Sequence, residues 1–232
     1  MTGARVRLAA LASVLATVAV GCGGAAPADR DVARAPARPA TTTPTTTTPT
    51  TTTAVDGVVE VRYRIERRVD DAATAGFADV VRATLTDPRG WVGAGFRLVE
   101  DPAAEYLVVL AEGEEVDRLC FPYRTGARFS CQNGPVVAMN ADRWRVATET
   151  WTGDRASYRQ MLVNHEVGHL LGRHHPPEPQ CPAPGRSAPV MAQQSTDLDG
   201  CLPNPWPLPE ELLGAARHDE PLAPPYEKST SG

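Results

Sequence analysis

Four of the five histidines in the chain lie in one short stretch, between His165 and His175. His165 and His169 are four residues apart, so in a helix both rings lie on the same face, one turn from each other. That is the spacing at which two imidazole nitrogens can bind one Zn²⁺ ion. Glu166 follows the first histidine, where its carboxylate can reach a water on the metal without binding the metal itself. The stretch therefore predicts a zinc site with an adjacent general base.

A third ligand is expected just beyond this helix. Gly172 can adopt a positive φ without strain, so it can end the helix and reverse the chain. His175, three residues later, then returns to the metal, although a shift of one residue would bring His174 there instead. Three histidines leave one of the four zinc positions open, as in catalytic sites. Structural sites fill all four positions with protein ligands, typically cysteine, so the pattern favours a catalytic ion.

The stretch has the form His-Glu-x-x-His-x-x-Gly-x-x-His, and this extended motif resembles that of the metzincin zinc metalloproteases. That family also has a tight turn carrying a methionine beneath the metal, and Met191, in the sequence Pro-Val-Met-Ala, resembles it. Ordinary core packing is the alternative for this methionine. Some metzincins place a tyrosine just after that turn, and this chain has none there, so any phenol that the family offers to the oxyanion is missing.

The order of signal, Thr/Pro tether, motif and proline-rich tail is also similar to an uncharacterised family of exported bacterial metzincin-like proteins. The resemblance implies a catalytic domain over residues 55–227, followed by a short tail at 228–232. Its fold would be α+β and zincin-like, with a mixed sheet backed by helices, an active-site helix and an irregular C-terminal subdomain. The resemblance further implies a peptidase with one catalytic Zn²⁺ ion, held by His165, His169 and His175, with Glu166 as its base.

Hydrophobic periodicity indicates the same α+β class without the motif. Residues 59–66 alternate between apolar and polar, as in a half-buried strand, and residues 72–86 carry apolar residues at helical spacing. We expect further strands at 96–100, 106–111, 128–131 and 136–140, the motif helix at 157–171 and a terminal helix at 210–217. Asn133-Gly134 predicts a hairpin turn. That hairpin is our candidate for the edge strand that would bind a peptide by main-chain hydrogen bonds.

The five cysteines are Cys22, Cys120, Cys131, Cys181 and Cys201. If Cys22 is lipidated, an even number remains, which in an exported protein implies disulfides. Three pairings are possible, and local closure favours Cys120–Cys131 and Cys181–Cys201, because each pair brackets a Gly/Pro-rich loop. A cysteine-based zinc site is the weaker alternative, since the chain has no Cys-x-x-Cys spacing.

The amino-terminal part predicts export. Arg5 and Arg7 precede an apolar run at 8–20, so residues 1–21 are typical of a secretory signal peptide. Its end, Ala-Val-Gly-Cys22, resembles a lipobox, in which the cysteine is diacylated, although that motif usually has leucine where this chain has Ala19. Residues 22–54 are rich in Thr and Pro and predict an extended tether. We expect the protein on the outer face of the cell membrane, held by its lipid, or else secreted.

The 232-residue chain has a formal net charge of −5 and no run of lysine or arginine, so nucleic-acid binding is unlikely on electrostatic grounds. Paired carboxylates at Glu114-Glu115 and Glu210-Glu211 are more typical of solvated surfaces than of acid-base pairs, and His218 is expected at the surface. The favoured function is a monomeric zinc-dependent endopeptidase acting on peptides or proteins. The alternatives are a cell-wall peptide amidase and a non-catalytic zinc-binding lipoprotein.

Overall fold

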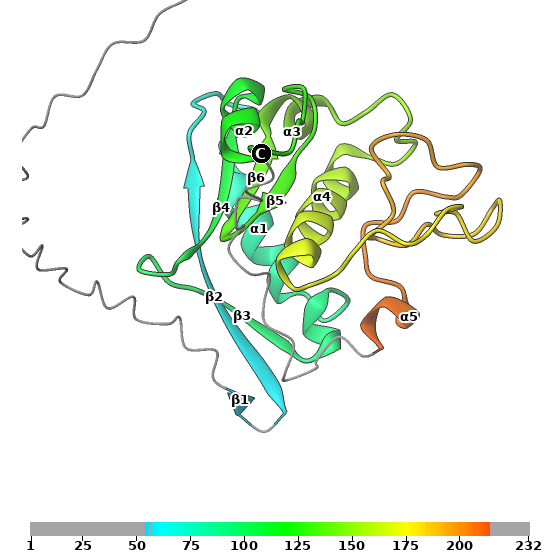
Figure 1. Cartoon of the computed structure of the whole chain (residues 1–232), viewed down its shortest axis with the longest axis horizontal. Helices are drawn as coiled ribbons and strands as arrows, with labels where there is room; N and C mark the ends of the chain where they lie inside the picture. The colour runs from blue at the N-terminus through cyan, green and yellow to red at the C-terminus, as the bar shows by residue number, and fades with distance from the viewer. Residues whose placement is uncertain (1–53, 56, 214–232) are drawn as a thin grey trace, which may run out of the picture. The chain divides into compact units, whose positions relative to one another are not determined.

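The computed structural model describes residues 54–55 and 57–213 (Figure 1). The predicted signal peptide, the lipidation site Cys22, nearly all of the predicted tether and the segment 214–232 with His218 lie outside the described residues. Within the described part, no helix combines the length and the apolar character needed to cross a membrane.

A mixed six-stranded sheet forms the centre of the fold. Its strands are β1 (Ala54–Val55), β2 (Val58–Arg67), β3 (Phe96–Glu100), β4 (Tyr106–Ala111), β5 (Cys131–Asn133) and β6 (Val136–Asn140). The order is β1-β2-β4-β6-β5, with β3 also paired to β2. Strands β2, β3, β4 and β6 run parallel, whereas β1 and β5 are antiparallel to their neighbours. The predicted hairpin is therefore present, and its first strand β5 ends the order of the sheet.

That first strand begins later than the predicted 128–131. Residues 128–130 form a loop because their polar groups bond to the end of β6 and to the segment that follows it. The Arg128 carbonyl accepts a hydrogen bond from Arg143 Nε at 2.9 Å, and the Ser130 hydroxyl accepts one from the Asn140 N–H at 3.0 Å. Only Cys131 and the two residues after it pair with β6.

The helices are α1 (Phe77–Thr86), α2 (Gly113–Leu119), α3 (Ala141–Val146), α4 (Arg155–Leu170) and α5 (Pro209–Leu212), with a 3₁₀ turn at Trp91–Ala94. α1 begins later than the predicted residue 72, because Asp71 and Thr74 close a separate turn through the bond from the Thr74 N–H to the Asp71 carboxylate. The short helices α2 and α3 were not predicted. α4 is the predicted motif helix, and the Asp154 carboxylate caps its first turn.

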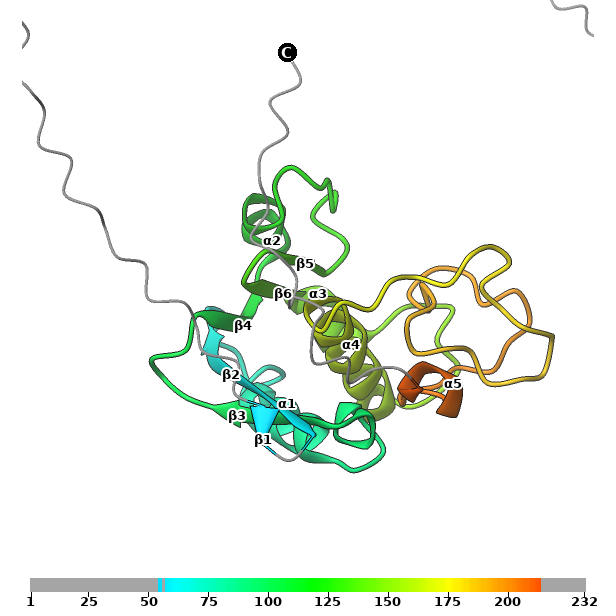
Figure 2. The same ribbon diagram turned by 60° about the horizontal axis from the view of Figure 1, so that its bottom comes forward.

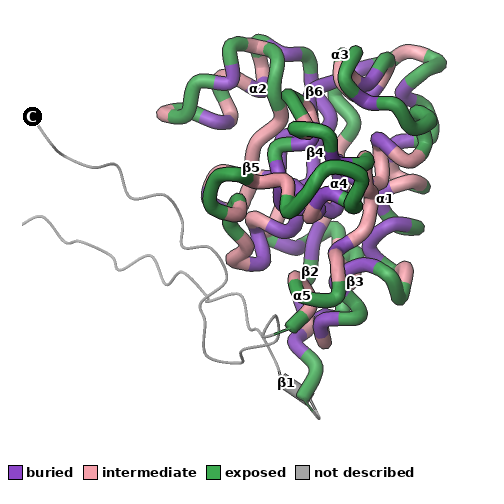
Figure 3. Tube along the Cα trace, turned by 90° about the vertical axis from the view of Figure 1, so that its right-hand side faces the viewer, coloured by how far each residue is buried: buried purple, intermediate pink, exposed green. Residues whose placement is uncertain are grey.

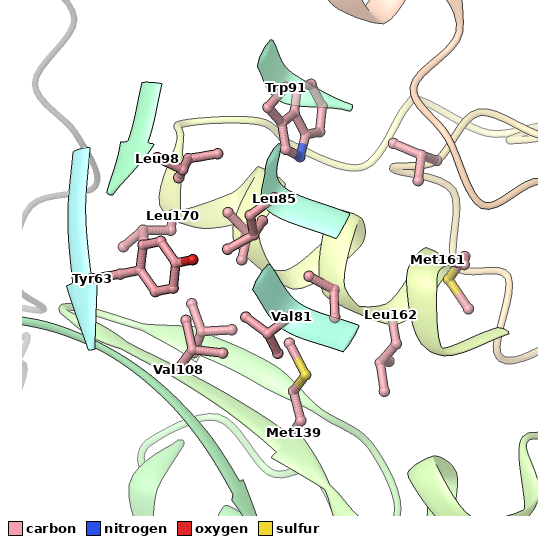
Figure 4. Packing of buried hydrophobic residues seen from close by; sticks show 14 of the residues in the cluster. Tyr63, Val81, Leu85, Trp91, Leu98, Val108, Met139, Met161, Leu162 and Leu170 are labelled. Atoms are coloured by element: carbon pink, nitrogen blue, oxygen red, sulfur yellow. The ribbon is translucent and has the colours of Figure 1, made fainter. Parts of the chain in front are cut away.

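Helices cover both faces of the sheet, which confirms the predicted α+β class. On one face α1 and α4 pack against the sheet, with Val81, Leu85, Leu162 and Leu170 meeting Tyr63, Leu98, Val108 and Met139 (Figure 4). On the other face α2 covers β4 and β6 through Val116 and Cys120. Because β4 is buried on both faces, it is apolar along its length rather than alternating (Figures 2 and 3). The result is a rigid support for α4.

The segment between α4 and α5 has no named helix or strand, as predicted, and forms the yellow and orange loops beside α4 (Figure 1). Polar contacts hold it. The buried Gln194 side chain donates to the carbonyls of Pro189 and Asn204 and accepts from the Asn204 N–H. Disulfides join Cys181 to Cys201 in this segment and Cys120 to Cys131 at the start of β5, the pairing that the sequence favoured.

The double substitution Cys181→Ser, Cys201→Ser tests how far the irregular segment depends on its disulfide. We expect the free energy of unfolding to fall by roughly 3 kcal/mol, the chain-entropy value for a loop of about twenty residues. The far-UV circular dichroism should persist, because the sheet and α4 have their own apolar core. Urea unfolding followed by circular dichroism measures the free energy and the spectrum, and hydrogen exchange reports the order of residues 171–208. The matched pair Cys120→Ser, Cys131→Ser should leave exchange in residues 171–208 unchanged. Loss of the native spectrum in the first variant would contradict this separation.

Candidate metal centre

α4 places two of the predicted ligands on its inner face. These ligands are His165, which is 9% exposed, and His169, which lies one turn later and is half-buried. The predicted base Glu166, beside His165, is 5% exposed. The helix ends at Leu170, and Gly172 follows with a φ of 79°. At this turn the Arg173 N–H bonds back to the Gly168 carbonyl at 2.8 Å. The chain therefore reverses at the predicted glycine. Glycine adopts this positive φ without strain, whereas a residue with a side chain would be strained there.

This reversal brings the third histidine to the other two. His175 Nε2 lies 3.1 Å from His169 Nε2 and 3.3 Å from His165 Nε2. Among the described residues, the cluster able to hold a metal consists of His165, His169 and His175, without His174. The predicted set is thus brought together in the predicted register.

Two backbone carbonyls orient the helical imidazoles. His165 Nδ1 lies 2.8 Å from the Val190 carbonyl oxygen, and His169 Nδ1 lies 2.8 Å from the Arg173 carbonyl oxygen. Because a carbonyl oxygen only accepts, each Nδ1 carries the proton in these bonds. A neutral ring then has its free lone pair on Nε2, the atom that faces the other histidines.

Burial keeps these rings neutral. It lowers the pKa of His165 to about 3 and that of His169 to about 4, and the neighbouring imidazoles lower both further. His175 is the exposed member of the cluster, and the partial burial of its ring in the site also lowers its pKa. Since a metal binds the neutral imidazole, the three rings do not have to lose protons at neutral pH before binding.

The geometry fits a tetrahedral zinc ion. With Zn–N bonds of about 2.0–2.1 Å, two nitrogens of a tetrahedral site lie about 3.3–3.4 Å apart. Two of the three separations, 3.1 and 3.3 Å, are close to that value, and all three ligand atoms lie within 4.8 Å of one another. Three neutral nitrogen donors also match the ligand preference of zinc, and they leave a fourth position for a water or substrate.

Glu166 lies beside this cluster. Burial raises the pKa of its carboxyl to about 8, well above the usual range for glutamate. A carboxylate held in so apolar a place is a stronger base than one in water. Glu166 also lines a cavity of about 1030 Å³ together with the three histidines, so the base and the open metal position share one space.

Met191 lies against the same helix. A Cβ added to Gly168 would be 2.4 Å from Met191 Sδ, so the absence of a side chain at this position lets the methionine contact α4 between the two helical histidines. The preceding residue, Val190, supplies the carbonyl that orients His165. Met191 is 3% exposed and packs in the main core, and it lies in a turn closed by the bond from the Ala192 N–H to the Pro189 carbonyl at 3.0 Å.

Glu211 holds this turn, which corrects its expected place on a solvated surface. Its carboxylate accepts the N–H groups of Val190 and Met191, both at 2.9 Å, and that of Leu208 at 2.7 Å. Burial raises the pKa of Glu211, and these backbone bonds act in the opposite direction. The contact of Glu211 with this turn carried no signal in the sequence, because Val190 and Met191 are about twenty residues away and contribute backbone groups.

The substitution Glu211→Gln tests this contact. The amide keeps the shape but loses the charge, so bonds to Val190 and Met191 weaken, and we expect a loss of roughly 1–2 kcal/mol of unfolding free energy. Hydrogen exchange should speed up at the amides of Val190 and Met191 in particular. The matched variant Glu210→Gln changes the exposed neighbour and should alter neither quantity by more than about 0.5 kcal/mol. Unchanged exchange at the two amides in Glu211→Gln would show that the carboxylate does not hold the turn.

Comparison with solved structures finds a resemblance to archaemetzincin (amzA) from Methanopyrus kandleri, with 12% sequence identity and a TM-score of 0.39, over 68% of this chain and 93% of that chain. No curated protein matches the sequence. Residues 32–209 match the family described as protein of unknown function (DUF3152). Since the match spans well over half of the 232 residues, the chain belongs to the DUF3152 family.

Proposed function

We propose that this protein is a zinc-dependent endopeptidase. The observation that carries the proposal is the convergence of three histidine Nε2 atoms, at 3.1 and 3.3 Å, on one wall of a cavity that also contains the buried Glu166. Residues His165, His169 and His175 would bind the ion. The open fourth position and the adjacent base are what a hydrolase needs and what a structural zinc site lacks.

When bound, zinc supplies a Lewis acid that polarises the substrate carbonyl and makes water more acidic. Glu166 accepts the proton of the attacking water and delivers it to the leaving amine. In the metal-free chain burial raises the pKa of Glu166 to about 8, and the positive charge of a bound ion would lower it, which favours the carboxylate form that accepts the proton. The Val190 and Arg173 carbonyls keep the helical imidazoles in the binding tautomer throughout.

The proposed substrate is an extended peptide lying along β5. This strand ends the sheet order, and Cys131 and Gln132 line the same cavity as the histidines. Strand β5 uses one edge to pair with β6, so its other edge is the place for an added strand. The Cys120–Cys131 disulfide fixes the start of β5 to the end of α2, which limits the movement of that edge.

We also propose that the protein acts outside the cytoplasm, anchored through Cys22. Two disulfides in the described part of the chain are typical of an oxidising compartment. The signal and lipobox resemblance at residues 1–22 supports the anchor.

The first test is metal binding and turnover. The purified chain should bind about one zinc ion, measured by metal analysis, and should cleave peptides in a mixed library in a chelator-sensitive way. His165→Ala and His169→Ala should abolish zinc binding. Glu166→Gln should keep the metal and reduce kcat by roughly 10²–10⁴-fold.

The adjacent histidines provide a matched control. His175→Ala should weaken zinc binding strongly, and His174→Ala should leave it nearly unchanged, because only His175 belongs to the cluster. Metal loss in Glu166→Gln would make Glu166 a ligand and reject the proposed mechanism. Stoichiometric zinc without cleavage of any peptide would instead indicate a binding protein.

The second test is anchoring. If Cys22 is lipidated, Cys22→Ser should move the protein from the membrane fraction to the medium, because the chain released from its signal peptide then carries no acyl group. Cell fractionation with immunodetection measures this, and mass spectrometry of the mature amino terminus identifies the acyl groups. Unchanged membrane association of the variant would reject the lipobox interpretation.

A further inference from the structure

The guanidinium of Arg143 forms part of the wall of the cavity beside the histidines. Arg143 lies on α3, and two contacts fix its side chain. Its Nε donates to the Arg128 carbonyl at 2.9 Å, and its guanidinium carbon lies 5.7 Å from the centre of the Phe129 ring. Phe129 lines the cavity too. The head group is thus held in place with its two terminal nitrogens still available.

This charge has no carboxylate partner among the described residues. The ion pairs of α3 belong to Arg145, which contacts Asp71, Glu112 and Asp142. Arg143, two residues earlier, bonds to a carbonyl and an aromatic ring only. A half-buried guanidinium without a counter-ion is an efficient binding site for a carboxylate, because its terminal N–H groups can form a bidentate pair.

Two hydroxyl groups lie in the same region. Tyr158 Oη lies 2.9 Å from Ser195 Oγ, and Ser195 lines the cavity. Arg159, which follows Tyr158 on α4, donates from Nε to the carbonyl of Trp144 at 2.8 Å, and Trp144 follows Arg143 on α3. The start of α4 with Tyr158 is therefore in contact with the part of α3 that carries Arg143. The Ser195 hydroxyl can add a donor for an anion held by Arg143.

The distance from the proposed reaction centre follows from the helix. Tyr158 precedes Glu166 by eight residues on α4, which corresponds to about 12 Å along the helix axis. An extended peptide advances about 3.3 Å per residue. An anionic group bound near Tyr158 would thus lie within about three or four residues of the cleaved bond, nearer if a long side chain carries it.

The surrounding charges make such binding selective. The chain is acidic, and Glu166, Glu210 and Glu211 also line the cavity. A carboxylate on the substrate is repelled by these groups everywhere except near a cation. The other arginine in the wall, Arg173, lies within the histidine motif, just after the C-terminal end of α4, whereas Tyr158 lies near the N-terminal end of that helix.

We propose that Arg143, with Ser195, forms a subsite that selects peptides with a carboxylate near the cleaved bond. The inference rests on the proposed peptidase function and adds the substrate class to it. The carboxylate can belong to an acidic side chain or to the peptide's own C-terminus, since the chemistry of recognition is the same.

A binding experiment tests the subsite without turnover. The zinc-loaded full chain carrying Glu166→Gln is titrated with fluorescent alanine-rich octapeptides, and anisotropy gives Kd. One series is blocked at both ends and carries Glu or Gln at each position in turn. The second has no acidic side chain and ends in a free or an amidated carboxyl. In one of the two series, we expect the peptide with the carboxylate to bind about tenfold more tightly than its neutral counterpart at low salt.

Substitutions then assign the effect. Arg143→Gln should remove the preference for the acidic peptide and leave the affinity for its neutral partner unchanged. Arg128→Gln is the matched control, because this exposed arginine lies 6.0 Å from the same Phe129 ring but does not line the cavity. Arg143→Lys keeps the charge without the planar fork, so it should retain part of the preference, and it serves if Arg143→Gln does not fold.

Equal affinities for the acidic and neutral peptides of both series would overturn the subsite, and so would the absence of any binding. The subsite would also be rejected if Arg128→Gln lost the preference for the acidic peptide to the same extent as Arg143→Gln. Turnover of the unmodified chain separates this outcome from the function. Cleavage without a charge preference would keep the peptidase and reject the subsite. An Arg143-dependent preference in binding, without cleavage of any peptide, would keep the subsite and reject the peptidase.

Discussion

The hydrogen bond from His165 Nδ1 to the Val190 carbonyl joins the two parts of the described domain. His165 belongs to α4, which packs on the sheet, and Val190 belongs to the irregular segment beyond the motif. The bond fixes the tautomer of the imidazole, so its Nε2 lone pair faces His169 and His175. It also holds the turn of Met191 beneath that imidazole. A metal-binding cluster needs both effects, because three nitrogens must meet within a few tenths of an ångström.

The sheet and α1 hold α4, which carries His165, in place. Apolar side chains from β2, β4 and β6 bury the inner face of α4, so its two histidines keep their positions without help from a ligand. The same burial has an electrostatic consequence. It raises the pKa of Glu166 and lowers the pKa values of the helical histidines, in each case by making the charged form unfavourable. Burial thus both fixes the positions of these side chains and sets their pKa values.

The irregular segment is held by other means. It buries few large apolar side chains, and its order comes from the Cys181–Cys201 disulfide, the buried amide of Gln194 and the carboxylate of Glu211. Apart from the bond between Gln194 and Pro189, these contacts join residues ten or more positions apart. Such contacts suit a loop that must form one wall of a cavity, since a wall made of regular secondary structure would need an apolar face of its own. The polar lining that results includes Ser195, which lines the same cavity as Arg143.

Local features of the sequence were sufficient for much of the fold and most of the candidate site. The four-residue spacing of His165 and His169, the positive φ available to Gly172 and the alternation of β2 each act over a few residues, where helix and strand geometry is set. The disulfide pairing followed from short loops for the same reason. The motif resemblance favoured His175 over His174, and the structure has the same set. Tertiary structure alone decided the contact of Gly168 with Met191, the place of Glu211 and the position of Arg143. Short helices such as α2 and α3 also depend on it, because so few residues cannot offset the entropy of nucleation without packing. These features rest on side chains distant in sequence meeting at one point, and no local pattern encodes that meeting.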